Sequence, residues 1–185
     1  MWRRIKNIYH FFNAFLANIS YGFPSRKMVV IGVTGTDGKT TTTSLIYHIL
    51  KVNNKKPAMI STVGACIGDK TYEVGFHVTT PSSFKLQKYI KKAKNSGTKY
   101  LVLEVTSHAI DQNRTYGIKF DMGVVTNITH EHLDYHRTYK QYVQTKMKML
   151  LSSKICILNK DDESYNILSS KLLPRRQAGK TPASP

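Results

Sequence analysis

The sequence predicts an α/β protein of the P-loop type, with a mostly parallel sheet and helices on both of its faces. Apolar runs of strand length alternate with segments of helical periodicity along most of the chain, which is typical of a parallel sheet. The first such run, at 28–33, leads directly into a glycine-rich segment at 34–42, and apolar residues at helical spacing follow it. A strand, a glycine-rich turn and a helix in this order predict a phosphate-binding loop.

The glycine-rich segment contains the residue types that hold a nucleoside triphosphate. Gly35 and Gly38 allow the backbone to bend so that successive N–H groups point into one concavity. Lys39 adds a positive charge, and Thr40 adds a hydroxyl group suited to Mg²⁺. The strict pattern G-x-x-x-x-G-K-[ST] is not met, because Val33 stands where the first glycine would be. The alternative is an ordinary glycine-rich turn, which the flanking strand and helix disfavour.

Further strands are expected at 57–61, 100–105, 120–126 and 154–158, with a hairpin around Gly68 and Asp69. Helices are expected at 82–95, at 139–151, and after Asp161-Asp162 as far as 172. Ligands bind beyond the carboxyl ends of parallel strands, and polar residues follow two of these strands. Glu104 closes one strand, where burying its charge would be costly without a cation, and a dense polar segment at 126–136 follows another. Mg²⁺ is the natural cation for such a site.

Composition narrows the possible partners without choosing among them. Lys and Arg number 28 against 11 Asp and Glu, so the formal net charge is +17, which suits nucleotides, RNA or an anionic membrane. The basic residues are scattered and no zinc-finger, RNA-stacking or helix-turn-helix pattern is present, so nucleic acid is not expected. Cys66 and Cys156 are far apart, which argues against a metal site and for a reducing, cytoplasmic location.

The two ends of the chain differ from its centre. Residues 1–21 are expected to form an amphipathic helix, which either docks on the globular domain or makes weak contact with a membrane surface through residues 1–20. Its polar residues rule out a membrane span. A linker is expected at 22–27, the main domain at 28–173, and a disordered tail at 174–185.

Four ordered motifs and one lysine carry a family resemblance. They are TGTDGKTTT at 34–42, TTP at 79–81, EVTSHAIDQNR at 104–114, TNITHEHLDYH at 126–136, and Lys146. The chain resembles the central ATPase domain of the Mur ligase family, and within it the MurE type. The resemblance implies a cytoplasmic, ATP- and Mg²⁺-dependent enzyme of peptidoglycan synthesis. Such an enzyme phosphorylates a carboxylate of UDP-MurNAc-L-Ala-D-Glu and lets an amino acid, diaminopimelate or lysine, attack the acyl phosphate.

The resemblance also implies roles for individual residues. Catalytic roles fall to Lys39, to His132 and to Lys146, which the family carbamylates so that it can orient a second Mg²⁺. The implied metal ligands are Thr40, Glu104, His132 and Lys146. The nucleotide would contact Asn127, near the adenine, and the loop residues Gly35, Thr36, Asp37, Gly38, Lys39, Thr40 and Thr41. The UDP-muramoyl-peptide would contact Thr79, Thr80, Ser107, Gln112 and Arg114.

The chain also departs from the family pattern. Glu131 stands where the family usually has Asp, and the family's N-terminal uridine-binding and C-terminal amino-acid-binding domains have no counterpart in these 185 residues. A separate polypeptide supplying the missing domain is one explanation, and a truncated reading frame is another. The alternatives are a non-catalytic module that binds ATP and muramoyl-peptide, or a fragment of a folylpolyglutamate- or cyanophycin-type ligase. The TTP and EVTSHAIDQNR motifs favour the muramoyl substrate.

Overall fold

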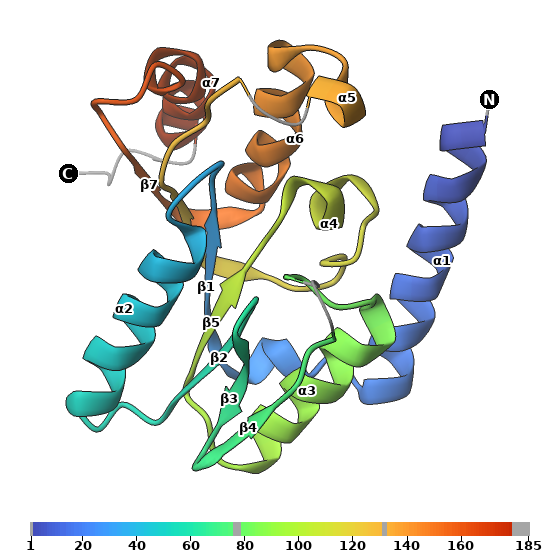
Figure 1. Ribbon diagram of the computed structural model, residues 1–185, viewed down its shortest axis with the longest axis vertical. Helices are drawn as coiled ribbons and strands as arrows, with labels where there is room; N and C mark the ends of the chain where they lie inside the picture. The colour runs from blue at the N-terminus through green and yellow to red at the C-terminus, as the bar shows by residue number, and fades with distance from the viewer. Residues whose placement is uncertain (1, 76–78, 131–132, 179–185) are drawn as a thin grey trace, which may run out of the picture.

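In the described part of the chain, seven strands form one sheet in the order β4-β3-β2-β5-β1-β6-β7 (Figure 1). The computed structural model describes residues 2–75, 79–130 and 133–178. Neighbouring strands from β2 to β7 in this order run parallel, whereas β3 and β4 form an antiparallel hairpin at the edge beyond β2. The predicted mostly parallel sheet is therefore confirmed. The strands are β1 (Val29–Thr34), β2 (Pro57–Ser61), β3 (Gly64–Ile67), β4 (Lys70–Tyr72), β5 (Tyr100–Glu104), β6 (Phe120–Val125) and β7 (Ser153–Leu158).

Helices cover both faces of the sheet. One face packs Val33, Val102 and Val124 against Ile46 and Leu50 of α2 (Lys39–Val52). The other face, which carries most of the core, packs against α3 (Ser83–Asn95), α4 (Ser107–Asp111) and α6 (Tyr139–Leu151). The alternation of side chains along each strand explains this division, because neighbouring residues point to opposite faces. The remaining helices are α1 (Trp2–Tyr21), the 3₁₀ helix η1 (Pro24–Lys27), α5 (Leu133–His136) and α7 (Tyr165–Ala178).

The parallel strands bring the polar motifs to one edge of the sheet. Val33 pairs with Glu104, and Thr34 pairs with Val125, so β1, β5 and β6 all end at the same level. β2 lies beside β5 and ends at this level as well. The phosphate-binding segment, Glu104 and the segment after β6 therefore meet where a parallel sheet places its ligands.

The chain ends differ in detail from the expectations. η1 occupies most of the expected linker, and Pro24 and Ser25 within it are buried. α7 continues to Ala178, so a disordered tail from 174 is wrong for residues 174–178. Arg, Gln and Ala at 175–178 are good helix formers, which favours continuation of the helix. Residues 179–185 lie outside the described residues. No helix in the described part of the chain has the length and apolar character needed to cross a bilayer.

Candidate active site

The phosphate-binding loop joins β1 to α2 and depends on two glycines. A Cβ atom on Gly35 would lie 1.8 Å from Thr126 Oγ1, so only glycine fits beside the segment that follows β6. Gly38 has φ 71° and precedes the first residue of α2, where its left-handed backbone turns the chain into the helix. The free N–H groups of the first turn of α2 therefore lie at the loop, which is the arrangement that binds phosphate.

The segment after β6 holds the loop in place. The backbone N–H of Thr36 donates to the Asn127 carbonyl at 2.9 Å, and the N–H of Asp37 donates to Asn127 Oδ1 at 2.8 Å. Thr126 Oγ1 donates to the Asp37 carbonyl at 2.6 Å, and Thr129 N–H donates to Thr36 Oγ1 at 2.9 Å. Asn127, expected near the adenine, thus braces the loop in this structure, a role that the sequence did not indicate.

The charged and hydroxyl groups of the loop face different partners. Lys39 Nζ donates across the loop to the carbonyl of Thr36. Thr40 Oγ1 donates to Glu104 Oε1 at 2.9 Å, which ties the start of α2 to the end of β5. Asp37, Gly38 and Thr41 are exposed, so this side of the loop is open to a ligand.

Glu104 is a buried carboxylate with a polar surrounding. It is 1% exposed and accepts hydrogen bonds from Thr40 Oγ1 and from the backbone N–H of Thr62 at 3.0 Å. The Thr62 hydroxyl also lies 3.2 Å from Glu104 Oε2. Sequence reasoning missed Thr62, although its place directly after the strand at 57–61 could have indicated it.

The oxygen atoms around Glu104 suit Mg²⁺. This ion takes one or two carboxylates and completes its shell with water and substrate phosphates, so a single buried carboxylate beside a hydroxyl at the phosphate loop fits it. Among the described residues no group of three or more His, Cys, Asp or Glu side chains is gathered. His132, expected as a metal ligand and catalytic residue, lies outside the described residues.

Lys146 lies beneath the loop rather than on the surface. Its side chain is 1% exposed, and Nζ donates to the Gly35 carbonyl at 2.6 Å and lies 4.6 Å from the centre of the Tyr142 ring. Burial, together with the charge of Lys39 and against that of Asp37, lowers the pKa of Lys146 to about 7. A surface lysine, the alternative that composition alone favours, is therefore excluded.

Four of the five expected substrate residues gather beside Glu104. Thr80 Oγ1 donates to the Glu104 carbonyl at 3.1 Å, and Arg114 Nη1 donates to the Thr80 carbonyl at 2.7 Å. Gln112 Oε1 accepts from Arg114 Nε at 2.8 Å and from Nη2 at 2.6 Å. Thr79 joins the group by accepting a hydrogen bond from Thr62 Oγ1 at 2.9 Å. The group links the segment after residue 78 to the end of α4.

Ser107, the fifth expected substrate residue, contacts a histidine instead. Its hydroxyl lies 2.9 Å from His136 Nε2, and both side chains are buried. The His136 ring lies 4.9 Å from that of Tyr142, whose hydroxyl is 3.3 Å from Thr36 Oγ1. A path of contacts thus runs from α4 through α5 and α6 to the phosphate loop. Sequence reasoning named His136 only as part of the polar segment, because 29 residues separate it from Ser107.

Comparison with known proteins fits this geometry. Residues 33–178 match the family model of the Mur ligase middle domain. The chain belongs to the Mur ligase family. Among its relatives, a UDP-N-acetylmuramoyl-L-alanyl-D-glutamate–2,6-diaminopimelate ligase 1 of Clostridium acetobutylicum is 42% identical over 143 residues, which cover 77% of this chain and 29% of the relative. The corresponding ligase of Geobacillus kaustophilus is 40% identical over 158 residues, covering 80% and 32%. The chain spans about a third of the length of these Mur ligases.

Solved structures agree with this assignment. A UDP-N-acetylmuramoyl-L-alanyl-D-glutamate–2,6-diaminopimelate ligase superimposes with a TM-score of 0.71 at 28% identity, over 80% of this chain and 30% of the ligase. The folylpolyglutamate synthase of Mycobacterium tuberculosis, solved with ADP, gives a TM-score of 0.68 over 90% and 45%. Its identity is only 13%, so it shares the fold and supports no closer relation. The Mur ligase family uses ATP, and this fold neighbour was solved with ADP.

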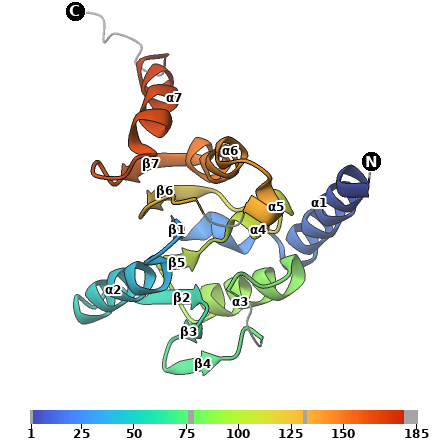
Figure 2. The same cartoon turned by 45° about the horizontal axis from the view of Figure 1, so that its top comes forward.

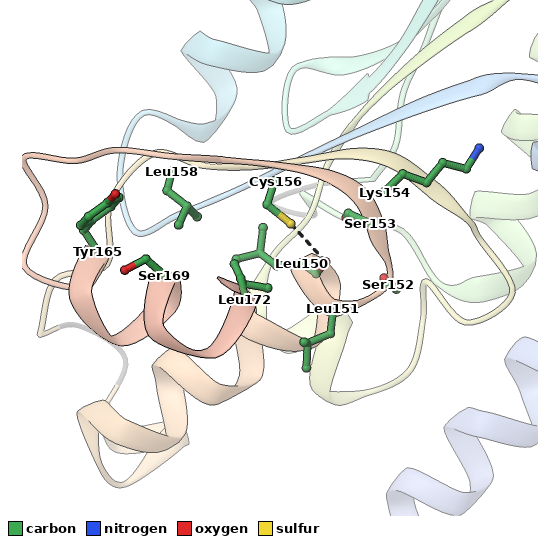
Figure 3. Close-up of a pocket in the computed structure, with 10 residues that line it drawn as sticks. All are labelled: Leu150, Leu151, Ser152, Ser153, Lys154, Cys156, Leu158, Tyr165, Ser169 and Leu172. Atoms are coloured by element: carbon green, nitrogen blue, oxygen red, sulfur yellow. Dashed lines mark hydrogen bonds between the residues drawn. The ribbon is translucent and has the colours of Figure 1, made fainter. Parts of the chain in front are cut away.

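A separate cavity of about 560 Å³ opens between β7, the end of α6 and α7. Figure 3 shows Leu150, Cys156, Leu158 and Leu172 around it, and none of the expected site residues lines it. The chemistry of the phosphate loop therefore does not involve this cavity.

Proposed function

We propose that this chain is the ATP-binding core of a MurE-type ligase. It would phosphorylate a carboxylate of UDP-MurNAc-L-Ala-D-Glu to give an acyl phosphate, which the amine of diaminopimelate then attacks. The observation that carries the proposal is Lys146, buried with its amine 2.6 Å from the Gly35 carbonyl of the phosphate loop. The pKa of this buried lysine is near 7, and a pKa shifted this far by burial is typical of groups that take part in catalysis, here beside the γ-phosphate. The names of the relatives supply the substrates.

The phosphate loop and its neighbours would bind Mg·ATP. The N–H groups at the start of α2 would hold the phosphates, and Lys39 would turn from the Thr36 carbonyl to the transferred phosphoryl group. Thr40 and Glu104 would hold Mg²⁺, which when bound neutralises phosphate charge and orients the γ-phosphate. His132 and Asn127 keep their proposed roles at the metal and near the adenine.

The same surroundings support carbamylation of Lys146. The neutral amine attacks CO₂, a C–N bond forms, and one proton is lost, which leaves an anionic carbamate in place of a cation. A pKa near 7 leaves much of the amine neutral at physiological pH, whereas an ordinary lysine would be almost wholly charged. The carbamate would attract a second Mg²⁺, and the repulsion between Lys146 and Lys39 would disappear.

The group around Arg114 would receive the carboxylate substrate. Hydrogen bonds of Thr79, Thr80 and Gln112 hold this group of residues beside Glu104. The group therefore lies at the same edge of the sheet as the phosphate loop. The planar guanidinium of Arg114 suits an anionic muramoyl-peptide, and Ser107 would add a hydroxyl on the α4 side. Groups that present the amino acid are proposed to lie in protein outside these 185 residues, either in a longer polypeptide or in a separate one.

Hydroxylamine trapping tests the proposal. Acyl phosphates react with hydroxylamine to give a hydroxamate and release phosphate. The chain, Mg·ATP and UDP-MurNAc-L-Ala-D-Glu should therefore produce ADP and a muramoyl-peptide hydroxamate, and Lys146→Met should abolish both. A parallel reaction with dihydrofolate instead of the dipeptide serves as the matched control. Binding of ATP without ADP release or hydroxamate would favour the non-catalytic binding module, and hydroxamate from dihydrofolate would favour the folylpolyglutamate-type ligase.

A further inference from the structure

Helix α1 docks on the domain through its small residues. Ala14, Ala17 and Asn18 are fully buried, and Asn18 Nδ2 donates to the Tyr116 carbonyl at 2.7 Å. The Phe11 ring meets the Tyr116 ring edge-to-face with centroids 4.6 Å apart. The helix packs along α3, on the side of the domain away from α2 (Figure 2). Docking, one of the two alternatives expected from the sequence, therefore occurs through Phe11 and these small residues.

The large apolar residues of α1 point away from the domain. They recur at steps of three and four residues and form one continuous stripe along the helix, which is the geometry of a single helix face. Their exposed fractions are Ile8 58%, Tyr9 65%, Phe12 58%, Phe15 39%, Leu16 51% and Ile19 52%. A contiguous apolar stripe of this kind marks a binding surface rather than ordinary solvent-facing helix.

The surroundings of the stripe carry positive charge. The first 36 residues contain no Asp or Glu, whereas Arg3, Arg4 and Lys6 lie in the first turns of α1. The adjacent helix α3 likewise has no acidic residue and carries Lys85, Lys88, Lys91, Lys92 and Lys94. The two packed helices therefore combine an apolar stripe with positive charge and no acidic residue, a combination complementary to an anionic lipid surface.

We propose that the outer face of α1 lies in the interface of an anionic membrane and holds the domain at the lipid surface. The apolar stripe would enter the boundary between headgroups and acyl chains while the lysines of α3 attract anionic headgroups. A second copy of the chain fits the face less well, because each copy carries a formal charge of +17. This inference is independent of the ligase activity.

The single tryptophan of the chain, Trp2, lies at the start of α1 and provides a reporter. The probes are vesicles of equimolar phosphatidylglycerol and phosphatidylcholine, and vesicles of phosphatidylcholine alone. We expect the chain to co-sediment with the anionic vesicles at low salt, with a blue shift of Trp2 emission, and to bind the uncharged vesicles weakly. The double variant Phe12→Ser/Leu16→Ser should lower the partition coefficient about tenfold or more, since it removes two large apolar groups from the interface.

The matched control is Leu45→Ser/Ile49→Ser on α2, where both side chains are 58% exposed. It should bind vesicles like the wild type, and circular dichroism should show that both double variants fold. Absence of wild-type binding to anionic vesicles would overturn the proposal, as would equal binding by the α1 variant or an equal loss in the α2 control. Dimerisation through this face, detected by light scattering and removed by Phe12→Ser/Leu16→Ser, would overturn it in favour of a second copy.

Discussion

Lys146 shows that the position of a residue in a helix and the burial of its side chain are both needed to interpret its role. It lies on the same face of α6 as the buried residues Tyr142, Val143, Met147 and Leu150, so its helical spacing already put it on the core side. Composition suggested the opposite, since Lys148 lies nearby and basic residues abound. The structure resolves the conflict, because the amine has a carbonyl partner and an aromatic ring at the phosphate loop.

The lowered pKa of Lys146 predicts a pH-dependent stability. Its folded-state pKa of about 7 lies below the ordinary lysine value of 10.5, so the unfolded chain binds more protons between these two pH values. Wild-type stability should therefore rise with pH through this window relative to Lys146→Met, by about 2 kcal/mol from pH 7 to pH 9. Urea denaturation of both proteins in CO₂-free buffer measures the difference. If the difference in unfolding free energy between wild type and Lys146→Met stays constant from pH 7 to pH 9, the pKa of Lys146 is not lowered in the folded protein.

At the scale of elements, the strands and the phosphate loop could be predicted well from the sequence. The β-branched runs at 28–33 and 100–105 have no competing periodicity, and the loop follows the first of them directly. The short helices α4 and α5 escaped prediction because four or five residues give no periodic signal. The contact of Ser107 with His136 escaped it as well, because only tertiary packing of these two helices brings the side chains together.

The brace between the phosphate loop and the segment after β6 predicts a specific steric effect. Gly35→Ala would place Cβ 1.8 Å from Thr126 Oγ1, so the loop or the strand end must move. We expect a loss of roughly 2 kcal/mol or more in unfolding free energy, the scale of overpacking, together with weaker nucleotide binding. Combining Gly35→Ala with Thr126→Gly should recover part of the stability, because the clashing hydroxyl is gone. Additive losses in the double variant, measured by urea denaturation, would place the strain elsewhere.

The described residues form one sheet with flanking helices, and the proposed ATP site lies at one edge of this sheet. The sheet, its helices and α1 account for the described residues, and the chain spans about a third of the matched relatives. Amide formation requires an amine held about 3 Å from the acyl carbon, and positioning of this kind commonly comes from a closing domain.

We therefore predict that the 185-residue polypeptide alone forms no UDP-MurNAc-tripeptide with either diaminopimelate or lysine. Slow ADP release in the presence of UDP-MurNAc-dipeptide is the most that the phosphate loop and its neighbours should support. Mass spectrometry of the reaction mixture measures the product. Tripeptide formed over multiple turnovers by the purified chain would mean that these residues position the amine unaided.

Binding of Mg·ATP at the loop between β1 and α2 is the central claim, and titration calorimetry with a non-hydrolysable ATP analogue and Mg²⁺ tests it most directly. Lys39→Ala should weaken binding by about 1.5–3 kcal/mol, the scale of a hydrogen bond to a charged group. Lys51→Ala, at the exposed far end of the same helix, should leave the affinity unchanged. Equal affinity of wild type and Lys39→Ala, or no binding by the wild type, would contradict the assignment of this loop as the nucleotide site.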